Sequence, residues 1–260
     1  MNFKHLNAEG AETCSLVLSH LWAEVYGIDQ RGSGTCAASD WAKLIDQALH
    51  AASEKNAESV IFRIVEKTDA TELIQQLPTL GFKFKEGRVE YRAFLSDLPD
   101  DSGSPIIWKT AQDLSWSEKQ VADFLRDVAE GAPDFEPGED PLTHIQDWLK
   151  DPVLSAGPHC VVIGFVEGKA SALVVAQVNP RTLWSRISYM GLLPKMRGKG
   201  FGKWLYRKGF SMLKQQGGDL YHGGTNSQNE AMIHLFKTHG CRTYHRMQEW
   251  VWKRQKENAL

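Results

Sequence analysis

A glycine-rich loop between an apolar strand and an amphipathic helix restricts the fold of this chain most strongly. The stretch from 187 to 203 reads ISYMGLLPKMRGKGFGK, with glycines at positions 198, 200 and 202. Pro194 predicts the end of the strand, because proline has no N–H to donate. Glycine lets the backbone turn tightly and approach a ligand with no side chain in between. We therefore expect this turn to present main-chain amides.

The charges around the loop indicate what those amides bind. A helix predicted from 201 to 216 adds its unpaired first-turn N–H groups and the positive end of its dipole. Four cations crowd the same stretch, namely Lys195, Arg197, Lys199 and Lys203. The combination predicts a site for a polyanion, most simply a pyrophosphate. The alternative is a turn that only ends the strand, but such a turn needs neither three glycines nor four cations.

Spacing excludes two other phosphate-binding loops. The nucleotide-binding P-loop requires G-x-x-x-x-G-K-[ST], whereas Trp204 follows Gly202-Lys203 here. The dinucleotide motif requires G-x-G-x-x-G, whereas single residues separate these three glycines.

The rest of the chain alternates predicted helices and strands, which indicates an α/β fold. Apolar spacing predicts helices over 116–128 and 142–149, then a hairpin of 160–166 with 170–178 and a strand over 184–193. After the loop helix we expect a strand over 220–225, a helix over 229–238 and a final strand pair ending at Trp252. A cluster of Asp, Ser, Pro and Gly between 94 and 108 predicts a domain boundary, which gives domains 1–100 and 101–260.

An internal repeat predicts that the two parts are related. The segment 59–94 can be laid on 218–252 with a constant offset of 159, which brings Gly81 onto Gly240 and Tyr91 onto Trp250. The match is one of residue type rather than identity, and chance remains the alternative because strand, helix and strand is a common order. A helix predicted over 41–52 precedes the first copy, but that copy has no counterpart of the glycine loop.

At this point the chain resembles the GCN5-related N-acetyltransferases. Arg197, Gly200 and Gly202 fill the acyl-CoA motif of that family, and Asn229, Phe236, Gly240 and Cys241 fill the places of a second family element. The two elements cover about 104–252. The resemblance implies a mixed central sheet flanked by helices, of α/β (α+β) class. It also implies a tandem arrangement, in which residues 1–100 form a degenerate, truncated module of the same kind.

The resemblance also implies an activity, the transfer of acetyl from acetyl-CoA to a primary amine of a small molecule by direct attack. The residues expected to contact acetyl-CoA are Leu192, Leu193, Arg197, Gly198, Lys199, Gly200, Phe201, Gly202, Lys203, Asn229 and Phe236. In the family, two parallel strands splay apart around the pantetheine arm, and the exposed edge here is 190–193. An N–H near Leu192 or Leu193 would polarise the thioester carbonyl.

The chain departs from the family at the catalytic groups, so we nominate no catalytic residue. Phe236 stands where many members have a tyrosine that protonates the departing thiolate. The strand over 184–190 has no carboxylate that could act as a base. Ser188, His222 and Tyr244 are the polar candidates, but we favour the alternative that each is a half-buried strand residue. The alternative function is therefore a non-catalytic acyl-CoA-binding or regulatory module.

Composition excludes several other classes of protein. The formal charge of −2 argues against a nucleic-acid-binding surface. The start of the chain lacks the apolar core of a secretion signal and no apolar run is long enough to span a bilayer, so we expect a cytoplasmic protein without membrane contact. Four dispersed cysteines predict packed thiols, and no metal-ligand spacing occurs. Acidic residues at 134, 136, 139 and 140 would either attract a cationic amine or form a solvated loop.

Overall fold

The computed structural model consists of two compact units. The first comprises Met1–Val89 with His245–Leu260, and the second comprises Glu90–Tyr244. The structure describes residues 2–8, 11–18, 22–26, 38–54, 57, 59–66, 71–132, 140–151 and 153–254. No helix within these ranges is both long and apolar enough to cross a bilayer.

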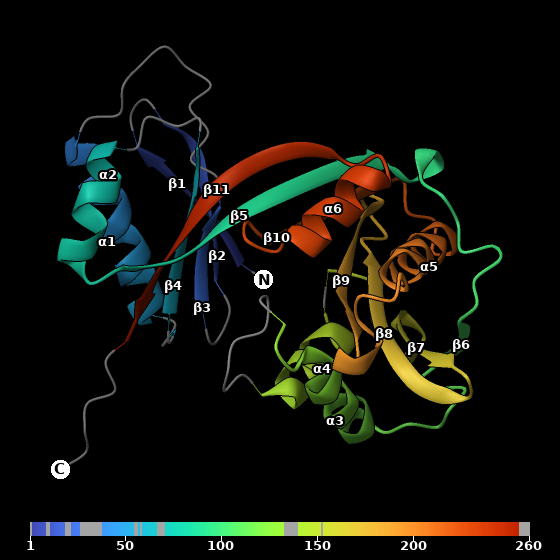
Figure 1. The fold of residues 1–260 in the computed structure, drawn as a ribbon. Helices are drawn as coiled ribbons and strands as arrows, with labels where there is room; N and C mark the ends of the chain where they lie inside the picture. Colours follow the sequence, from blue (N-terminus) through green and yellow to red (C-terminus); the bar gives the residue numbers. More distant parts are fainter. Residues whose placement is uncertain are drawn as a thin grey trace. The chain divides into compact units, whose positions relative to one another are not determined.

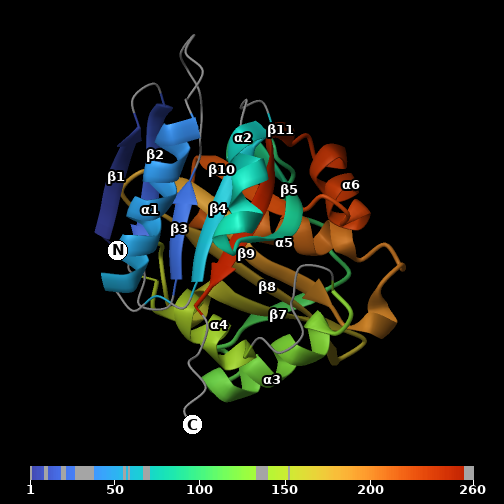
Figure 2. The same cartoon turned by 90° about the vertical axis from the view of Figure 1, so that its left-hand side faces the viewer.

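The first unit has a sheet in the order β1-β2-β3-β4-β11. Its elements are β1 (Asn2–Ala8), β2 (Ala11–Leu18), β3 (Trp22–Tyr26), α1 (Ala38–Glu54), β4 (Ser59–Val65), α2 (Thr71–Gln76) and the 3-10 helix η1 (Leu77–Leu80). Within the described residues, β3 and β4 pair in parallel, whereas β1 with β2, β2 with β3 and β4 with β11 pair antiparallel. Figure 2 shows α1 and α2 on one face of this sheet. The helix that the sequence predicts over 41–52 is therefore confirmed as α1.

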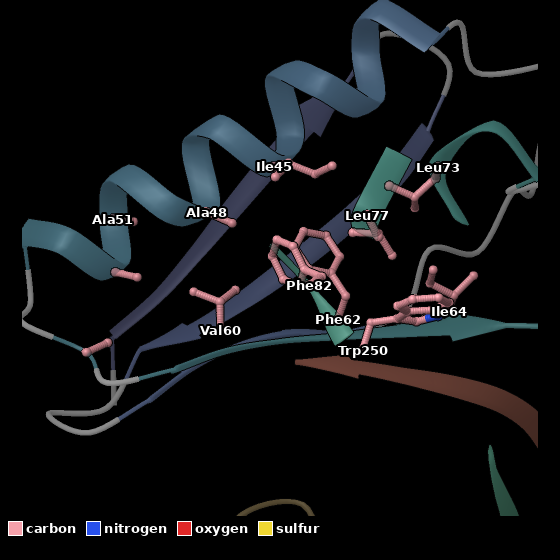
Figure 3. Packing of buried hydrophobic residues seen from close by; sticks show 12 residues of the cluster. Ile45, Ala48, Ala51, Val60, Phe62, Ile64, Leu73, Leu77, Phe82 and Trp250 are labelled. Carbon is pink, nitrogen blue, oxygen red and sulfur yellow. The ribbon is translucent and has the colours of Figure 1, made fainter. Parts of the chain in front are cut away.

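The core of the first unit lies between these helices and the sheet. Figure 3 shows Ile45 and Ala48 of α1 directed toward Phe62 of β4, with Leu77 and Phe82 filling the space beside them. Phe62 and Phe82 meet edge to face with ring centroids 5.1 Å apart. Fully burying each of these side chains stabilises the fold by about 1.5–3 kcal/mol.

The second unit has the strand order β5-β10-β9-β8-β7-β6. Its elements are β6 (Ile107–Thr110), α3 (Glu118–Ala129), α4 (Pro141–Leu149), β7 (Val161–Val166), β8 (Lys169–Val178), β9 (Trp184–Leu192), α5 (Gly202–Gln215), β10 (Leu220–Asn226) and α6 (Glu230–Thr238), with 3-10 helices η2 (Leu95–Asp97), η3 (Pro158–Cys160) and η4 (Pro194–Met196). Every helix and strand that the sequence predicts here is confirmed up to residue 238, within a few residues. Figure 1 shows these elements in chain colours.

Helices cover both faces of the second sheet. Val175 of β8 packs into the cluster formed with α3 and α4. A Cβ added to Gly209 of α5 would touch Val174, the neighbouring residue of β8. Successive strand residues point to opposite faces, so α5 and the α3–α4 pair lie on opposite sides of the sheet. The mixed sheet flanked by helices is therefore confirmed.

Two long strands run from one unit into the other, β5 (Lys83–Phe94) and β11 (Arg242–Lys253). Residues 247–253 of β11 pair antiparallel with β4, whereas β5 lies next to β10 in the strand order. The predicted strand pair ending at Trp252 is wrong, because 242–253 form one continuous strand. The compact units consequently divide at 89/90 and 244/245, whereas residue 100 lies in the connection between η2 and β6.

The element bounds follow the offset of the internal repeat. Both strands β5 and β11 have 12 residues, and both ends of β11 lie 159 residues after those of β5. The glycine before each strand has a left-handed backbone, with φ of 85° at Gly81 and 83° at Gly240. Buried residues occupy equivalent places, since Phe62 and Leu77 in the first unit match Tyr221 and Phe236 in the second. That the first unit is a truncated acetyltransferase module stays a prediction.

Candidate functional site

The glycine loop joins the end of β9 to the start of α5 through η4. Gly198 and Gly200 have φ of 73° and 79°, a left-handed conformation that side chains disfavour. A Cβ added at either glycine would meet nothing within 4 Å. Gly202 differs, because it is the first residue of α5 and an added Cβ would lie 3.4 Å from a Leu235 methyl group. Gly198 and Gly200 are therefore required by the turn, and Gly202 lies close to α6.

The loop presents consecutive main-chain donors. The N–H groups of Met196 and Arg197 donate to the carbonyls of Leu193 and Pro194, and the N–H of Trp204 donates to the carbonyl of Phe201. The six amides between Arg197 and Trp204 donate no hydrogen bond to any residue that the structure describes. These are the amides of Gly198, Lys199, Gly200, Phe201, Gly202 and Lys203. Phe201, the N-cap of α5, provides no side-chain cap, and the first turn holds no acidic residue. Six unpaired donors at a helix N-terminus suit a phosphate-bearing anion.

Three lysines add positive charge to these donors. Lys195, Lys199 and Lys203 are all exposed. Within the described ranges, none of them forms an ion pair with a carboxylate, whereas Lys208 farther along α5 pairs with Asp101. Lys203 lies over the Trp204 ring, with its Nζ 5.2 Å from the ring centroid. Their charge is therefore available to a ligand at the loop.

Arg197 has a different role from the lysines. Its Nε donates to the carbonyl of Leu192 at 3.1 Å, and an Nη donates to the carbonyl of Val128 at 2.9 Å. Val128 lies in the last turn of α3, where carbonyls lack helical partners. The guanidinium thus ties the loop to the end of β9 and to α3. Arg197 is a positioning residue for the loop, rather than one more free cation.

The edge of β9 offers further main-chain groups. The N–H of Leu193 donates to the carbonyl of Ser171 at 3.0 Å, so this amide is occupied. In an antiparallel pair, alternate residues direct their amides to the same neighbour, so those of Leu192 and Met190 face away from β8. The register pairs of β9 with β10 join only Trp184 to Leu220 and Ser185 to Tyr221. Beyond Ser185, the two parallel strands are no longer paired, as the resemblance implies.

Asn229 at the N-cap of α6 and Phe236 within α6 are predicted site residues, and both contact other residues of the protein. Asn229 caps the helix, with its side chain accepting a hydrogen bond from the Met232 N–H at 3.1 Å. Phe236 is 1% exposed, and its ring stacks on Tyr91 with centroids 4.3 Å apart. Tyr206 meets the Phe236 ring edge to face. In this structure, Phe236 is therefore part of an aromatic core.

The described cysteines are packed thiols, as the sequence predicts. Cys160 and Cys241 are free and buried. Burial raises the pKa of Cys160, and it raises the pKa of Cys241 to about 11. Neither thiol is a thiolate near neutral pH, and the thiolate is the nucleophilic form. Cys14 and Cys36 lie outside the residues whose side chains are described.

A polar cluster that the sequence does not connect lies on β5, β10 and β11. His222 Nε2 and Glu90 Oε2 are 3.0 Å apart, with the two side chains 18% and 17% exposed. Tyr244 meets His222 edge to face at 6.0 Å, and the Arg92 guanidinium lies 3.2 Å from the Tyr244 ring centroid. The sequence names His222 and Tyr244 as candidates but misses Glu90. The repeat could have found it, because the same offset places Glu90 on Glu249 and His222 on Arg63.

The sequence also names Ser188 and a group of four acidic residues as candidates. The Ser188 hydroxyl donates to Gln177 Oε1 at 2.6 Å, within a bulge of β9, so Ser188 is held within the sheet. Acidic positions 134, 136 and 139 lie outside the described residues, and Asp140 is the N-cap of α4. Across the described part of the chain, no three His, Cys, Asp or Glu side chains gather as a metal site would require.

Known structures share this fold. A GCN5-related N-acetyltransferase from Sphaerobacter thermophilus is 16% identical, with a TM-score of 0.59 over 94% of this chain and 76% of that one. A functionally unknown conserved protein from Staphylococcus epidermidis is 10% identical, with a TM-score of 0.66 over 98% and 95%. A tandem GNAT protein from the clavulanic acid biosynthesis pathway is 11% identical, with a TM-score of 0.56 over 95% and 80%. At these identities the likeness concerns the fold.

The sequence comparisons identify the part of the chain that holds the loop. No curated protein sequence matches the chain. The model of the acetyltransferase (GNAT) family matches residues 116–241, which include β9, the loop, α5 and α6. Residues 116–241 thus form an acetyltransferase domain of the GNAT family.

Proposed function

We propose that the protein is an acyl-CoA-dependent N-acetyltransferase that transfers acetyl from acetyl-CoA to a primary amine of a small molecule. The observation that carries the proposal is the row of six amides from Gly198 to Lys203 at the start of α5, which donate no hydrogen bond to any residue that the structure describes. This row lies in the acetyltransferase domain, directly after the strand whose edge is unpaired.

The residues present suit both ends of acetyl-CoA. The loop amides and the exposed lysines would hold the pyrophosphate, because both favour negative charge. The amides of Met190 and Leu192 would contact the pantetheine arm and the thioester carbonyl. Of the two amides expected from the sequence, only that of Leu192 remains available, since Leu193 donates to Ser171. A preorganised N–H on a developing oxyanion contributes about 3–4 kcal/mol to lowering the barrier.

Direct attack by the amine is favoured over a covalent acyl-enzyme. Burial raises the pKa of Cys160 and of Cys241, the two cysteines whose side chains the structure describes, so neither of them is a thiolate that could accept the acyl group. Phe236 cannot protonate the departing thiolate, but general acid catalysis contributes only about 10²- to 10⁴-fold. Acetyl-CoA supplies the activated acyl group, and the chain supplies binding and orientation.

We also propose that the first unit descends from the same fold, giving a tandem protein with domains near 1–100 and 101–260. The matching bounds of β5 and β11 and the equivalent glycines support this.

Coenzyme A binding tests the loop assignment. We expect Gly200→Ala to weaken coenzyme A affinity at least tenfold, because a methyl group would stand between the amides and the phosphates. Gly217→Ala is the matched control, since Gly217 also has a φ of 80° and open space around its added Cβ, but lies after α5. Both variants pay the same backbone strain of about 1–2 kcal/mol. Calorimetry separates them, and equal affinities would remove the loop from the site.

A non-catalytic acyl-CoA-binding module is the second candidate, favoured by the buried Phe236 at the place of the family's acid. An assay of thiol release against a panel of primary amines distinguishes the two functions. Binding of acetyl-CoA without turnover on any amine would establish the binding module.

A further inference from the structure

The side chain of Tyr189 lies along β9, on the face of the sheet that α3 and α4 cover. Tyr189 pairs across the sheet with Val175 of β8, and both belong to the cluster packed against these helices. A Cβ added to Gly191 would lie 2.7 Å from the Tyr189 hydroxyl and 3.0 Å from its ring. Because a C–C bond is about 1.5 Å long, the hydroxyl lies no more than about 4.2 Å from the Gly191 Cα. The glycine therefore leaves the space that the tyrosine ring occupies.

This position brings the Tyr189 hydroxyl to the amide that we assign to the thioester carbonyl. The Leu192 N–H belongs to the peptide group that directly follows Gly191. That amide lies in the plane of the sheet and faces away from β8, whereas the hydroxyl lies on the α3–α4 face. A thioester bound to the Leu192 amide therefore has the hydroxyl on the α3–α4 side of its carbonyl carbon.

Contacts with α4 and β8 fix the tyrosine ring in this position. The ring stacks on Trp148 of α4, with centroids 5.7 Å apart and an interplanar angle of 25°. The Trp148 carbonyl accepts a hydrogen bond from Gln177 Nε2 at 2.8 Å, and Gln177 Oε1 accepts one from the Ser188 hydroxyl at 2.6 Å. Ser188 is the extra residue of a β-bulge directly before Tyr189. Bulges of this kind re-aim a side chain next to an active site.

The opposite face of the sheet is filled beside β10. Tyr221 of β10 and Phe236 of α6 are both 1% exposed, and Tyr206 of α5 is fully buried. Both other rings meet Tyr206 edge to face. Tyr189, by contrast, is only partly buried. An acceptor therefore reaches the thioester from the α3–α4 face, which is the face that carries the Tyr189 hydroxyl.

We propose that the Tyr189 hydroxyl binds the acceptor's primary amine and orients its lone pair toward the thioester carbonyl carbon. This inference rests on the proposed acetyltransferase function. The phenol oxygen accepts a hydrogen bond from an N–H of the neutral amine, and a phenol can accept one hydrogen bond while it donates another. The nitrogen forms a bond with the carbonyl carbon, the C–S bond breaks, and the excess proton of the nitrogen goes to the thiolate. The products are an amide and free coenzyme A, and Tyr189 is unchanged.

Tyr189→Phe tests the contact, because it removes the hydroxyl and keeps the ring between Trp148 and Gly191. In a thiol-release assay with the most active amine of the panel, we expect kcat/KM for the amine to fall about 10- to 100-fold, since one hydrogen bond and the alignment of the nitrogen are lost. Coenzyme A affinity and melting temperature keep their wild-type values. Tyr91→Phe is the matched control, because the buried Tyr91 hydroxyl has no hydrogen-bond partner among the residues that the structure describes.

Gly191→Ala tests the same contact from the strand. The added methyl group would stand within 3.1 Å of both the hydroxyl and the ring, so the tyrosine side chain must move away. We expect a loss of kcat/KM for the amine of similar size to that of Tyr189→Phe. A folded Gly191→Ala protein with wild-type kcat/KM would show that the position of the hydroxyl does not matter, which overturns the proposal.

The remaining outcomes also decide the proposal. A loss of kcat/KM for the amine in Tyr189→Phe, with coenzyme A affinity and melting temperature retained, supports it. Wild-type kcat/KM in Tyr189→Phe overturns it, and so does an equal loss of coenzyme A affinity, which would mark a structural role. Coenzyme A binding by wild type without turnover on any amine overturns the acceptor contact while the loop assignment stands. Absence of coenzyme A binding in wild type overturns the proposed function itself.

Discussion

At the scale of single residues, the proposed acetyl-CoA site depends on main-chain groups more than on side chains. Gly198 and Gly200 are needed for their backbone conformation, which orients the amides beside them. Arg197 acts through two carbonyls rather than through a ligand. Phe236 contributes a ring to the core, stacked on Tyr91.

The burial of Phe236 changes what is expected of Phe236→Tyr. Phe236→Tyr would place a hydroxyl where many members of the family that the sequence resembles have a tyrosine that protonates the departing thiolate. In the structure the ring is 1% exposed, and an added Cβ on Gly223 would already lie 2.9 Å from it. We expect Phe236→Tyr to destabilise the protein by about 1–3 kcal/mol through overpacking, with no gain in turnover. Denaturant unfolding measures this, with Phe84→Tyr at a 54% exposed site as control. Higher turnover at unchanged stability would contradict it.

At the scale of elements, the strands β5 and β11 connect the two units. Residues 90–94 of β5 belong to the second unit, and residues 245–253 of β11 belong to the first. β5 brings Tyr91 to the ring of Phe236 and Glu90 to His222. The segment 1–100 therefore supplies part of the second unit, including Glu90 and Tyr91.

Removal of the first hundred residues tests this dependence. A chain of residues 101–260 lacks β5, so β10 loses its neighbour and Phe236 loses its stacking partner. We expect this fragment to show no cooperative unfolding transition by circular dichroism, because an unpaired strand edge and an exposed core favour aggregation. Co-expression with residues 1–100 restores the fold. Cooperative folding of 101–260 alone, with coenzyme A binding intact, would contradict the prediction.

At the scale of the whole molecule, the pH dependence of stability should reflect the buried Glu249. Burial raises the pKa of this carboxyl, but the charge and hydrogen bond of Arg63, with Lys85 and Arg88, lower it further than burial raises it. The net shift is downward from 4.5. A folded-state pKa below the unfolded one stabilises the protein above the unfolded value, and this stability is lost as pH falls through the folded value.

Glu249→Gln isolates this contribution. We expect the variant to be less stable than wild type by about 2 kcal/mol at pH 7, because Arg63 loses its charged partner. The difference should shrink as pH falls below 4.5, where the wild-type carboxyl becomes protonated. Urea titrations at several pH values measure it, with the exposed Glu54→Gln as control. A difference that stays constant with pH would exclude the ion pair as its source.

The sequence by itself determined the local structure of the second unit and the loop that carries the proposed site. Glycine, proline and apolar periodicity act within a few residues, so α3, the β7–β8 hairpin, β9 and α5 could be predicted from them. Tertiary structure alone decided which strands β5 and β11 pair with, which amides of β9 stay unpaired, and that Glu90 meets His222. These are contacts between residues far apart in the chain, and they depend on sheet register and packing, which no local pattern specifies.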